Sequence, residues 1–232
     1  MIGYVNKIES TGLLDGPGVR TVVFMQGCSL RCLFCHNPES WSKSIGKEYS
    51  PKELFNEIVK YKNYYGETGG VTFSGGEPLL QSEFLLEVCK LLKKENIHIC
   101  LDTAGVGNNY EELLELVDLI ILDIKHITNE EYKDITSKDI KYFEEFLNYC
   151  QIKNKDLWLR QVIVPGINDT EEYVLKLKKY ISKIKNVKKV ELLPYHNMAI
   201  SKYKNLNIKY RLIDTPPMDN LKCKRLEELL NN

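Results

Sequence analysis

The sequence predicts an α/β protein, a partial, TIM-like (β/α)6 barrel of parallel strands with its active site at their C-terminal ends. Strand-like and helix-like segments alternate six times, with no linker or internal repeat between them. The chain has 232 residues, whereas a closed eight-unit barrel usually needs about 250. A doubly wound open sheet is the rival architecture. We expect one domain over residues 1–232, with a core at about 15–200 and a C-terminal extension at 201–232.

The strands are predicted from short apolar runs rich in β-branched residues. The fourth run, Leu119–Ile124, is almost entirely apolar, as expected for a strand buried on both faces. The fifth run carries Arg160, a cation whose burial is costly without a partner. The six predicted strands are Val19–Met25, Val71–Phe73, Ile97–Leu101, Leu119–Ile124, Leu157–Val164 and Lys189–Leu193.

Helices are predicted between the strands from capping residues and apolar spacing. Ser50, Pro51 and Glu53 form a capping box with proline at the first helical position. Ser82–Glu95 has apolar residues at helical spacing, and Thr170 is an N-cap. The tail after Tyr203 is expected to be irregular up to a last helix. The predicted helices are Pro51–Tyr64, Ser82–Glu95, Tyr110–Val117, Ile140–Gln151, Thr170–Ile184 and Asp219–Leu230.

Composition excludes several classes of protein. The chain has 32 basic and 32 acidic residues, which argues against nucleic acid as a partner, because such binding normally needs a basic excess. No secretory signal and no apolar stretch of membrane-spanning length are present, so we expect no membrane partner and a cytoplasmic location. Of the seven cysteines, four are scattered, and we interpret them as ordinary buried residues. These four are Cys89, Cys100, Cys150 and Cys223.

The segment Gly27–Pro38 is the central chemical feature. It places three thiols, those of Cys28, Cys32 and Cys35, in one loop directly after the first predicted strand. Thiolates are soft ligands suited to iron–sulfur clusters and zinc. Three cysteines on a four-iron cubane would leave one iron open to a substrate. The alternative is a zinc knuckle that adds His36 as the fourth ligand.

Further polar motifs follow or lie near the C-terminal ends of the other strands. Taken singly, each is explained equally well as a tight turn, a helix cap or a solvated strand end. Taken together, they would share one face of a parallel barrel, where active sites lie. These motifs are Ser74–Pro78, Leu101–Thr103, Leu122–His126, Arg160 and Leu192–His196.

The cysteine loop, with an aromatic residue before its last cysteine, resembles the radical S-adenosylmethionine superfamily. The wider set of motifs is similar to that of the activating enzymes of pyruvate formate-lyase, over nearly the whole chain. The motifs that carry this resemblance are Asp15–Arg20, Phe24–Cys28, Cys35–Pro38, Thr72–Gln81, Leu101–Thr103, Asp123–Lys125, Val164–Gly166 and Glu191–His196.

The resemblance implies a role for each matching residue. Cys28, Cys32 and Cys35 would hold one [4Fe–4S] cluster, and Asp15 would lie near the entering substrate loop. Lys125 is expected to take part in catalysis. Asp102, Thr103 and Asp123 would bind a monovalent cation, Na⁺ or K⁺. The remaining expected contacts to S-adenosylmethionine are Phe34, Cys35, His36, Ser74, Gly75, Gly76, Glu77, Asp123, Ile124, Lys125, Arg160 and His196.

The resemblance also implies the reaction and the partners. One-electron cleavage of S-adenosylmethionine would give a 5′-deoxyadenosyl radical, which takes a hydrogen atom from a glycine of pyruvate formate-lyase under anaerobic conditions. Flavodoxin or ferredoxin would supply the electron, and the enzyme would be a monomer. Two alternatives remain: an activase of another glycyl radical enzyme, and a non-catalytic zinc-binding interaction module.

Overall fold

The computed structural model describes residues 1–232, apart from the side chain of Ser44. The chain divides into two compact units. Unit 1 comprises Met1–Ser29 and Ser40–Leu122, and unit 2 comprises Leu30–Glu39 and Asp123–Asn232. The single domain expected from the sequence stays a prediction. In the part of the chain described, no helix has the length and apolar character needed to cross a membrane.

Unit 1 is built on a sheet that runs β3-β1-β2-β4-β5-β6. β2, β4, β5 and β6 are parallel, with Val23 opposite Phe73, whereas β1 pairs antiparallel with both β2 and β3. Parallel pairing places the C-terminal ends of β2, β4 and β5 along one edge. The strands are β1 (Gly3–Gly12), β2 (Arg20–Met25), β3 (Lys47–Tyr49), β4 (Gly70–Gly75), β5 (His98–Thr103) and β6 (Leu119–Asp123).

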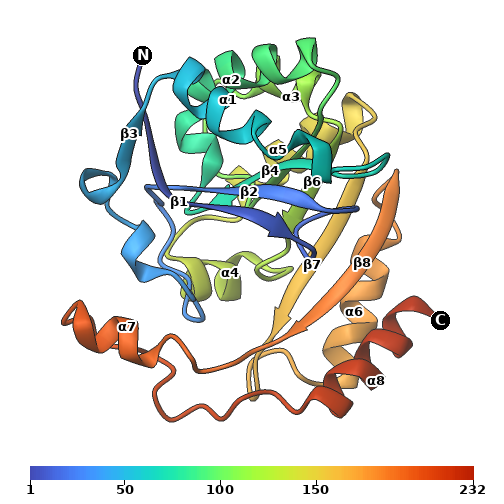
Figure 1. Cartoon of the computed structure of the whole chain (residues 1–232). Coiled ribbons are helices and arrows are strands. Elements are labelled where there is room, and N and C mark those ends of the chain that lie inside the picture. Colours follow the sequence, from blue (N-terminus) through green and yellow to red (C-terminus); the bar gives the residue numbers. More distant parts are fainter. The chain divides into compact units, whose positions relative to one another are not determined.

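Apolar residues on the central strands of unit 1 form its core. Val23, Phe73 and Leu101 have no exposed surface, as expected for strands covered on both faces. The helix α2 packs between α1 and α3 at the top of Figure 1. These helices are α1 (Pro51–Val59), α2 (Ser82–Lys94) and α3 (Glu111–Leu116), with 3₁₀ turns at η1 (Pro38–Ser40), η2 (Lys43–Ile45), η3 (Lys62–Tyr64) and η4 (Pro78–Gln81).

Unit 2 holds the last two parallel strands, in which Arg160 lies directly opposite Glu191. Its C-terminal helix packs against α6 and β8, as the orange and red ribbons of Figure 1 show. The elements are α4 (Asn129–Thr136), α5 (Lys141–Ile152), β7 (Leu157–Ile163), α6 (Glu171–Ile181), β8 (Val187–Pro194), α7 (Ile200–Asn205) and α8 (Asn220–Asn231).

All six predicted strands are present, and the capping box is confirmed: the Glu53 carboxylate accepts from the backbone N–H of Ser50 at 2.7 Å. The first predicted helix was too long, because α1 ends at Val59 rather than Tyr64. There the Tyr65 hydroxyl donates to the carbonyl of Ile58, at 3.0 Å, and the chain continues as a 3₁₀ turn. The strands β1 and β3 and the helices α4 and α7 were not predicted.

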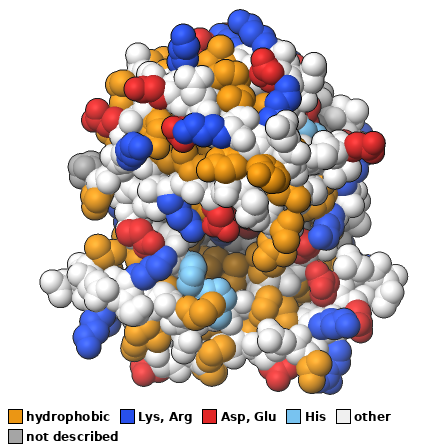
Figure 2. All heavy atoms as spheres, viewed as in Figure 1, with side chains coloured by type: hydrophobic (Ala, Val, Ile, Leu, Met, Phe, Trp, Pro, Cys, Tyr) orange, Lys and Arg blue, Asp and Glu red, His pale blue; other side chains and the backbone are white. Residues whose placement is uncertain are grey.

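Charged side chains of both signs are interspersed over the face of the molecule in Figure 2. This distribution agrees with the balance of 32 basic and 32 acidic residues. A field of one sign, which attracts polyanions to a surface, is not what this face presents.

Candidate active site

Cys28 lies just beyond the C-terminal end of β2, after Gln26 and Gly27, and belongs to unit 1. The turn that precedes it needs glycine, because Gly27 has φ +98° and a Cβ there would lie 2.6 Å from the Lys43 side chain. The backbone N–H groups of Gly27 and Cys28 donate to the carbonyls of Ser40 and Trp41, at 2.7 and 3.2 Å. Both ends of this short segment are therefore fixed by backbone hydrogen bonds.

Cys32 and Cys35 lie in the part of the loop that belongs to unit 2, Leu30–Glu39. The N–H groups of Arg31 and Leu33 donate to the carbonyls of Thr136 and Ile135, at 2.8 and 2.9 Å. These carbonyls belong to the last turn of α4, where helical carbonyls have no partner within the helix. The end of α4 thus positions the loop that carries the two thiols.

The helix α7 holds the same loop through side chains. The ammonium group of Lys202 donates to Asn37 and Glu39, both at 2.7 Å, and the Tyr203 hydroxyl donates to the carbonyl of Cys35 at 3.2 Å. This contact was not predicted from the sequence, because no helix was expected over Ile200–Asn205. The segment is only six residues long and has too few apolar residues for a helical periodicity to be recognised.

The three loop thiols have the chemistry that an iron–sulfur cluster needs. Cys28, Cys32 and Cys35 are half-buried, and none of the three forms a disulfide. Burial raises the pKa of the Cys32 thiol to about 12, against the lowering effect of Lys125, and metal binding must therefore displace its proton. No three His, Cys, Asp or Glu side chains are gathered as a metal site within the described residues. The fit is one of donor type and spacing.

The glycine turn after β4 packs against the end of β2. A Cβ on Gly76 would lie 2.3 Å from the carbonyl oxygen of Gly27, so no larger residue fits there without displacement. The N–H groups of Gly76 and Glu77 donate to the carbonyls of Met25 and Gly27, both at 2.9 Å. The turn is thereby locked to the residues that precede Cys28.

Glu77 is nearly inaccessible, at 1% exposed, yet its carboxylate is well hydrogen-bonded. It accepts from the Thr103 hydroxyl at 2.5 Å, from the N–H of Ala104 at 2.9 Å and from the N–H of Leu79 at 3.1 Å. Such hydrogen bonds satisfy a buried carboxylate, which would otherwise be costly. Glu77 therefore ties the glycine turn to the end of β5, a structural role beside the one expected from the sequence.

Ser74 and Asp102 also meet in unit 1. The Ser74 hydroxyl donates to the Asp102 carboxylate at 2.7 Å, across the neighbouring strands β4 and β5. Together with the Thr103–Glu77 hydrogen bond, this contact joins the motif Ser74–Pro78 to the motif Leu101–Thr103 at the C-terminal ends of β4 and β5. The carboxylate and hydroxyl oxygens are of the type that hard cations prefer, and the cation itself stays a prediction.

Lys125 is a buried, positively charged residue of unit 2 that contacts two other predicted site residues, Asp123 and Phe34. Its ammonium group lies 2.6 Å from the Asp123 carboxylate and 5.6 Å from the centroid of the Phe34 ring. Burial alone would lower the pKa of Lys125, but the Asp123 charge outweighs it and the pKa is raised. A fixed positive charge therefore lies within electrostatic reach of Cys32.

Arg160 has the partner that its burial requires. Its Nε donates to Glu191 at 2.8 Å, from the directly opposite position of β8. The carbonyl of Arg160 accepts from the N–H of Ile124 at 2.8 Å, which joins two predicted contacts through the backbone. His36 and His196 also meet, edge to face, with ring centroids 4.4 Å apart. Glu191 was not predicted as a site residue, although the buried charge of Arg160 indicated that a partner should be present.

The scattered cysteines are buried, as interpreted from the sequence. They are free thiols with at most 3% of their surface exposed. Burial raises the pKa of Cys100 and of Cys150 to about 12 and that of Cys223 to about 11, so these thiols stay protonated near neutral pH. Buried thiols of this kind are inert.

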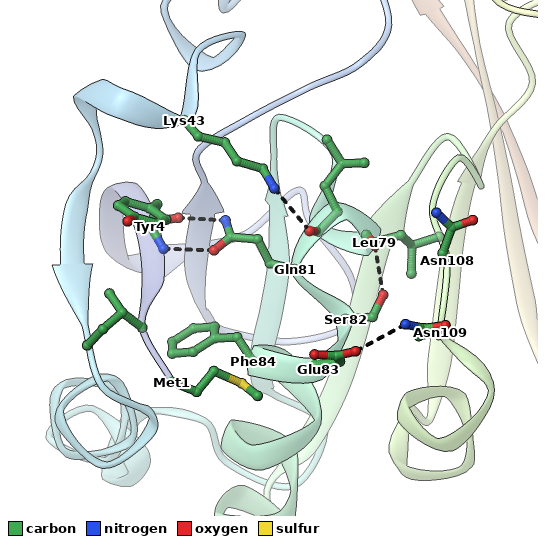
Figure 3. A pocket seen from close by; sticks show the side chains of 12 residues that line it. Met1, Tyr4, Lys43, Leu79, Gln81, Ser82, Glu83, Phe84, Asn108 and Asn109 are labelled. Atoms are coloured by element: carbon green, nitrogen blue, oxygen red, sulfur yellow. Dashed lines mark hydrogen bonds between the residues drawn. The ribbon is translucent and has the colours of Figure 1, made fainter.

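A pocket of about 460 Å³ lies beside η4, and its twelve lining residues include none of the predicted site residues. Figure 3 shows Gln81 reaching across it to Tyr4. The Gln81 side chain accepts from the N–H of Tyr4 at 2.7 Å and donates to the carbonyls of Tyr4 and Gln26, at 2.9 and 2.8 Å. Gln81 thus joins the segment after the glycine turn to β1 and to the residue before Gly27.

The motifs have counterparts in known proteins. The family model of the radical SAM superfamily matches residues 22–178. A pyruvate formate-lyase-activating enzyme of Clostridium pasteurianum is 50% identical over 99% of this chain and 98% of its own length. The enzyme of the same name from Staphylococcus epidermidis is 42% identical over 99% of this chain and 95% of its own length.

Solved structures share the fold. A radical SAM methyltransferase from Sphaerobacter thermophilus has a TM-score of 0.68 at 16% identity and covers 91% of this chain and 63% of its own. A domain of a pyruvate formate-lyase-activating enzyme from Bacteroides vulgatus has a TM-score of 0.57 at 19% identity, over 70% of this chain and 93% of its own. These likenesses confirm the predicted α/β fold, a partial barrel of parallel strands.

Proposed function

Because this chain belongs to the radical SAM superfamily and, within it, to the pyruvate formate-lyase-activating enzymes, we propose that it activates pyruvate formate-lyase by creating a glycyl radical. The observation that carries this proposal is the 50% identity over 99% of the chain. Its cofactors are a [4Fe–4S] cluster and S-adenosylmethionine. Bound together, they supply a one-electron cleavage that gives methionine and a 5′-deoxyadenosyl radical, which takes a hydrogen atom from a glycine Cα and leaves as 5′-deoxyadenosine.

Within this proposal, Cys28, Cys32 and Cys35 hold the cluster. The absence of a disulfide at any of the three supports the assignment, as do the backbone hydrogen bonds at Gly27 and at α4. A pre-shaped loop reduces the entropy that is lost when the ligands are ordered around a metal centre.

The remaining predicted residues bind and orient S-adenosylmethionine. Lys125 and Arg160 supply fixed positive charge toward its carboxylate, and both are held by carboxylate partners. The rings of Phe34, His36 and His196 line the adenosine side, and Ser74–Glu77 faces the methionyl ammonium. Ile124 presents its backbone. Asp102, Thr103 and Asp123 hold the monovalent cation, Na⁺ or K⁺, and Asp15 lies at the entry of the substrate loop.

The proposed partners are pyruvate formate-lyase and, as electron donor, flavodoxin or ferredoxin. The enzyme is a cytoplasmic monomer in this proposal. The balanced charge of the sequence argues against nucleic acid as a further partner, since nucleic-acid binding normally needs a basic excess.

Anaerobic purification tests the proposal. We expect a brown protein with iron and sulfide in cluster proportions, which releases 5′-deoxyadenosine from S-adenosylmethionine when a strong reductant is added. A colourless protein with stoichiometric zinc and no iron would contradict it. Activity toward another glycyl radical enzyme, with none toward pyruvate formate-lyase, would retain the chemistry and replace the partner.

A further inference from the structure

Three buried tyrosines of unit 2 lie in the segment that follows β8. Tyr195, Tyr203 and Tyr210 have between 3% and 5% of their surface exposed. They come from the end of β8, from α7 and from the segment after α7. A buried tyrosine hydroxyl is costly unless it is hydrogen-bonded. Each hydroxyl here has a partner, and the partners connect the tyrosines in a defined order.

Tyr195 is the fixed end of this series. Its N–H donates to the carbonyl of Ile163, the last residue of β7, at 3.0 Å, and its carbonyl accepts from the N–H of Met218 at 2.8 Å. Its hydroxyl lies 2.8 Å from that of Tyr210. Because the backbone of Tyr195 is tied to two neighbouring segments, its side chain gives Tyr210 a firm support.

Tyr210 reaches Tyr203 because the chain turns at the end of α7. Asn207 adopts φ +53°, a left-handed conformation that asparagine tolerates at a helix end, and the N–H of Ile208 donates to the carbonyl of Tyr203 at 3.0 Å. The rings of Tyr203 and Tyr210 pack with their centroids 4.5 Å apart. The Tyr203 hydroxyl donates to the carbonyl of Cys35 at 3.2 Å, so the series ends at the cysteine loop.

A second connection joins the same two segments. His36 follows Cys35, His196 follows Tyr195, and the two imidazole rings meet edge to face with their centroids 4.4 Å apart. The contacts therefore form a closed cycle, which runs from Cys35 through the three tyrosines and returns through the two histidines. Since protein interiors are closely packed, a shift of one member of this cycle displaces its neighbours.

The hydroxyl groups are what packing alone would not need. Phenylalanine would supply the same apolar rings, and replacing a buried polar pair by apolar groups of the same shape can be nearly neutral for stability. Two of the three hydroxyls bond to each other, and the third bonds to the backbone of Cys35. This arrangement favours a role in orienting Cys35.

We propose that the three tyrosines are positioning residues, which set the distance between Cys35 and His196. This inference rests on the proposed function, in which Cys35 is a cluster ligand and His196 contacts S-adenosylmethionine. Because the proposed cofactor would bind to the cluster and to the pocket at the same time, its affinity should depend on that distance. Groups that hold metal ligands from behind commonly change affinity when they are lost.

Tyr210→Phe tests the proposal, because it keeps the ring and removes the hydroxyl that bonds to Tyr195. Tyr65→Phe is the matched control: Tyr65 is also 5% exposed, and its hydroxyl donates to the carbonyl of Ile58 at 3.0 Å, in unit 1. Iron content and the Kd for S-adenosylmethionine are measured on the cluster-loaded protein under anaerobic conditions. We expect Tyr210→Phe to raise the Kd about tenfold at unchanged iron content, and Tyr65→Phe to raise it less than about twofold.

A double-mutant cycle with His196→Ala distinguishes positioning from a general loss of stability. If Tyr210 acts through the place of His196, Tyr210→Phe should change the Kd by less than about twofold in the His196→Ala background. An effect of Tyr210→Phe that is equally large in that background would overturn the proposal, as would an unchanged Kd in the wild-type background or an equal effect of Tyr65→Phe. Failure of the proposed function looks different, because the wild-type protein itself would then bind no cluster or no S-adenosylmethionine.

Discussion

The predicted site residues of the two units are held in different ways. In unit 1 the glycine turn, Glu77 and Thr103 are joined by backbone and hydroxyl hydrogen bonds in a nearly inaccessible environment. In unit 2 the Lys125 and Arg160 side chains form ion pairs with Asp123 and Glu191. The rings of His36 and His196 pack edge to face, and the Phe34 ring lies below the Lys125 ammonium group. The difference suggests that unit 1 supplies shape and unit 2 supplies charge. We therefore expect the largest losses of stability from substitutions at Glu77 in unit 1, and the largest losses of ligand binding from substitutions at Lys125 in unit 2.

The largest effect is expected in the cysteine loop. Cys32→Ala should remove a cluster ligand, so that iron falls to background and no glycyl radical forms. Iron analysis and electron paramagnetic resonance of the reduced protein provide the measurement. Cys89→Ala, at a fully buried thiol of α2, is the matched control and should keep its iron. Full iron in Cys32→Ala would refute the ligand assignment, and loss of iron in Cys89→Ala would reveal a second metal site.

Glu77→Gln tests whether the hydrogen bonds of Glu77 in unit 1 stabilise the fold. The amide keeps the shape but replaces one acceptor oxygen by a donor that faces the N–H of Ala104 or the hydroxyl of Thr103. We expect the free energy of unfolding in urea to fall by about 3 kcal/mol. Glu83→Gln, at an exposed carboxylate of α2, should change it by less than about 0.5 kcal/mol.

Glu77→Gln can also contradict the structural role given to Glu77. If Glu77→Gln leaves the free energy of unfolding unchanged and abolishes S-adenosylmethionine binding, Glu77 is a ligand of the methionyl ammonium rather than a tie between the glycine turn and β5. Loss of both properties would assign Glu77 both roles.

Lys125→Ala tests the charged half. Removing the ammonium group should weaken S-adenosylmethionine binding about tenfold or more and leave the iron content unchanged. Titration of the anaerobic protein measures the affinity. Lys176→Ala, in an exposed pair with Glu172 on α6, is the control and should bind normally. Equal affinity in Lys125→Ala would remove Lys125 from the site.

The smallest expected effect concerns pH and the Arg160–Glu191 pair. Burial pushes the pKa of Glu191 up, but hydrogen bonds from Lys189 and Arg160 outweigh it, and the pKa is lowered. The pair therefore stabilises the fold above the unfolded pKa of about 4.3 and loses this contribution as pH falls through the lower, folded value.

Glu191→Gln measures this contribution. At pH 7 we expect it to lower the free energy of unfolding by about 1.5 kcal/mol, and the difference from wild type should shrink as the pH falls below about 4. A difference that persists unchanged in acid would mean that the pair acts through packing and not through charge.

Much of the fold could be predicted because its signals are local. The apolar run Leu119–Ile124 and the capping box at Ser50 fix their elements without distant contacts. By contrast, β1 is a half-exposed strand without a continuous apolar run, and α4 has few apolar residues. Neither has a periodicity that stands out along the chain.

The site could be predicted as residue types but not as pairs. The sequence indicated that Arg160 needs a partner, and the register of β7 with β8 then identified Glu191. The hydrogen bonds of Glu77, and those between the cysteine loop and α7, depend on which elements are neighbours in the fold. The spacing of residues along the sequence does not reveal these neighbours. The same holds for Arg20 of β2, whose guanidinium donates to Thr72 and Val71 on β4 and to His98 on β5.

The most direct test is electron paramagnetic resonance after anaerobic incubation of the reconstituted protein with pyruvate formate-lyase, S-adenosylmethionine and a reductant. We predict a glycyl radical signal on the partner, formed together with an equal amount of 5′-deoxyadenosine and absent when Cys32→Ala replaces the wild type. A cluster-loaded protein that cleaves S-adenosylmethionine but leaves pyruvate formate-lyase without a radical would contradict the proposed function.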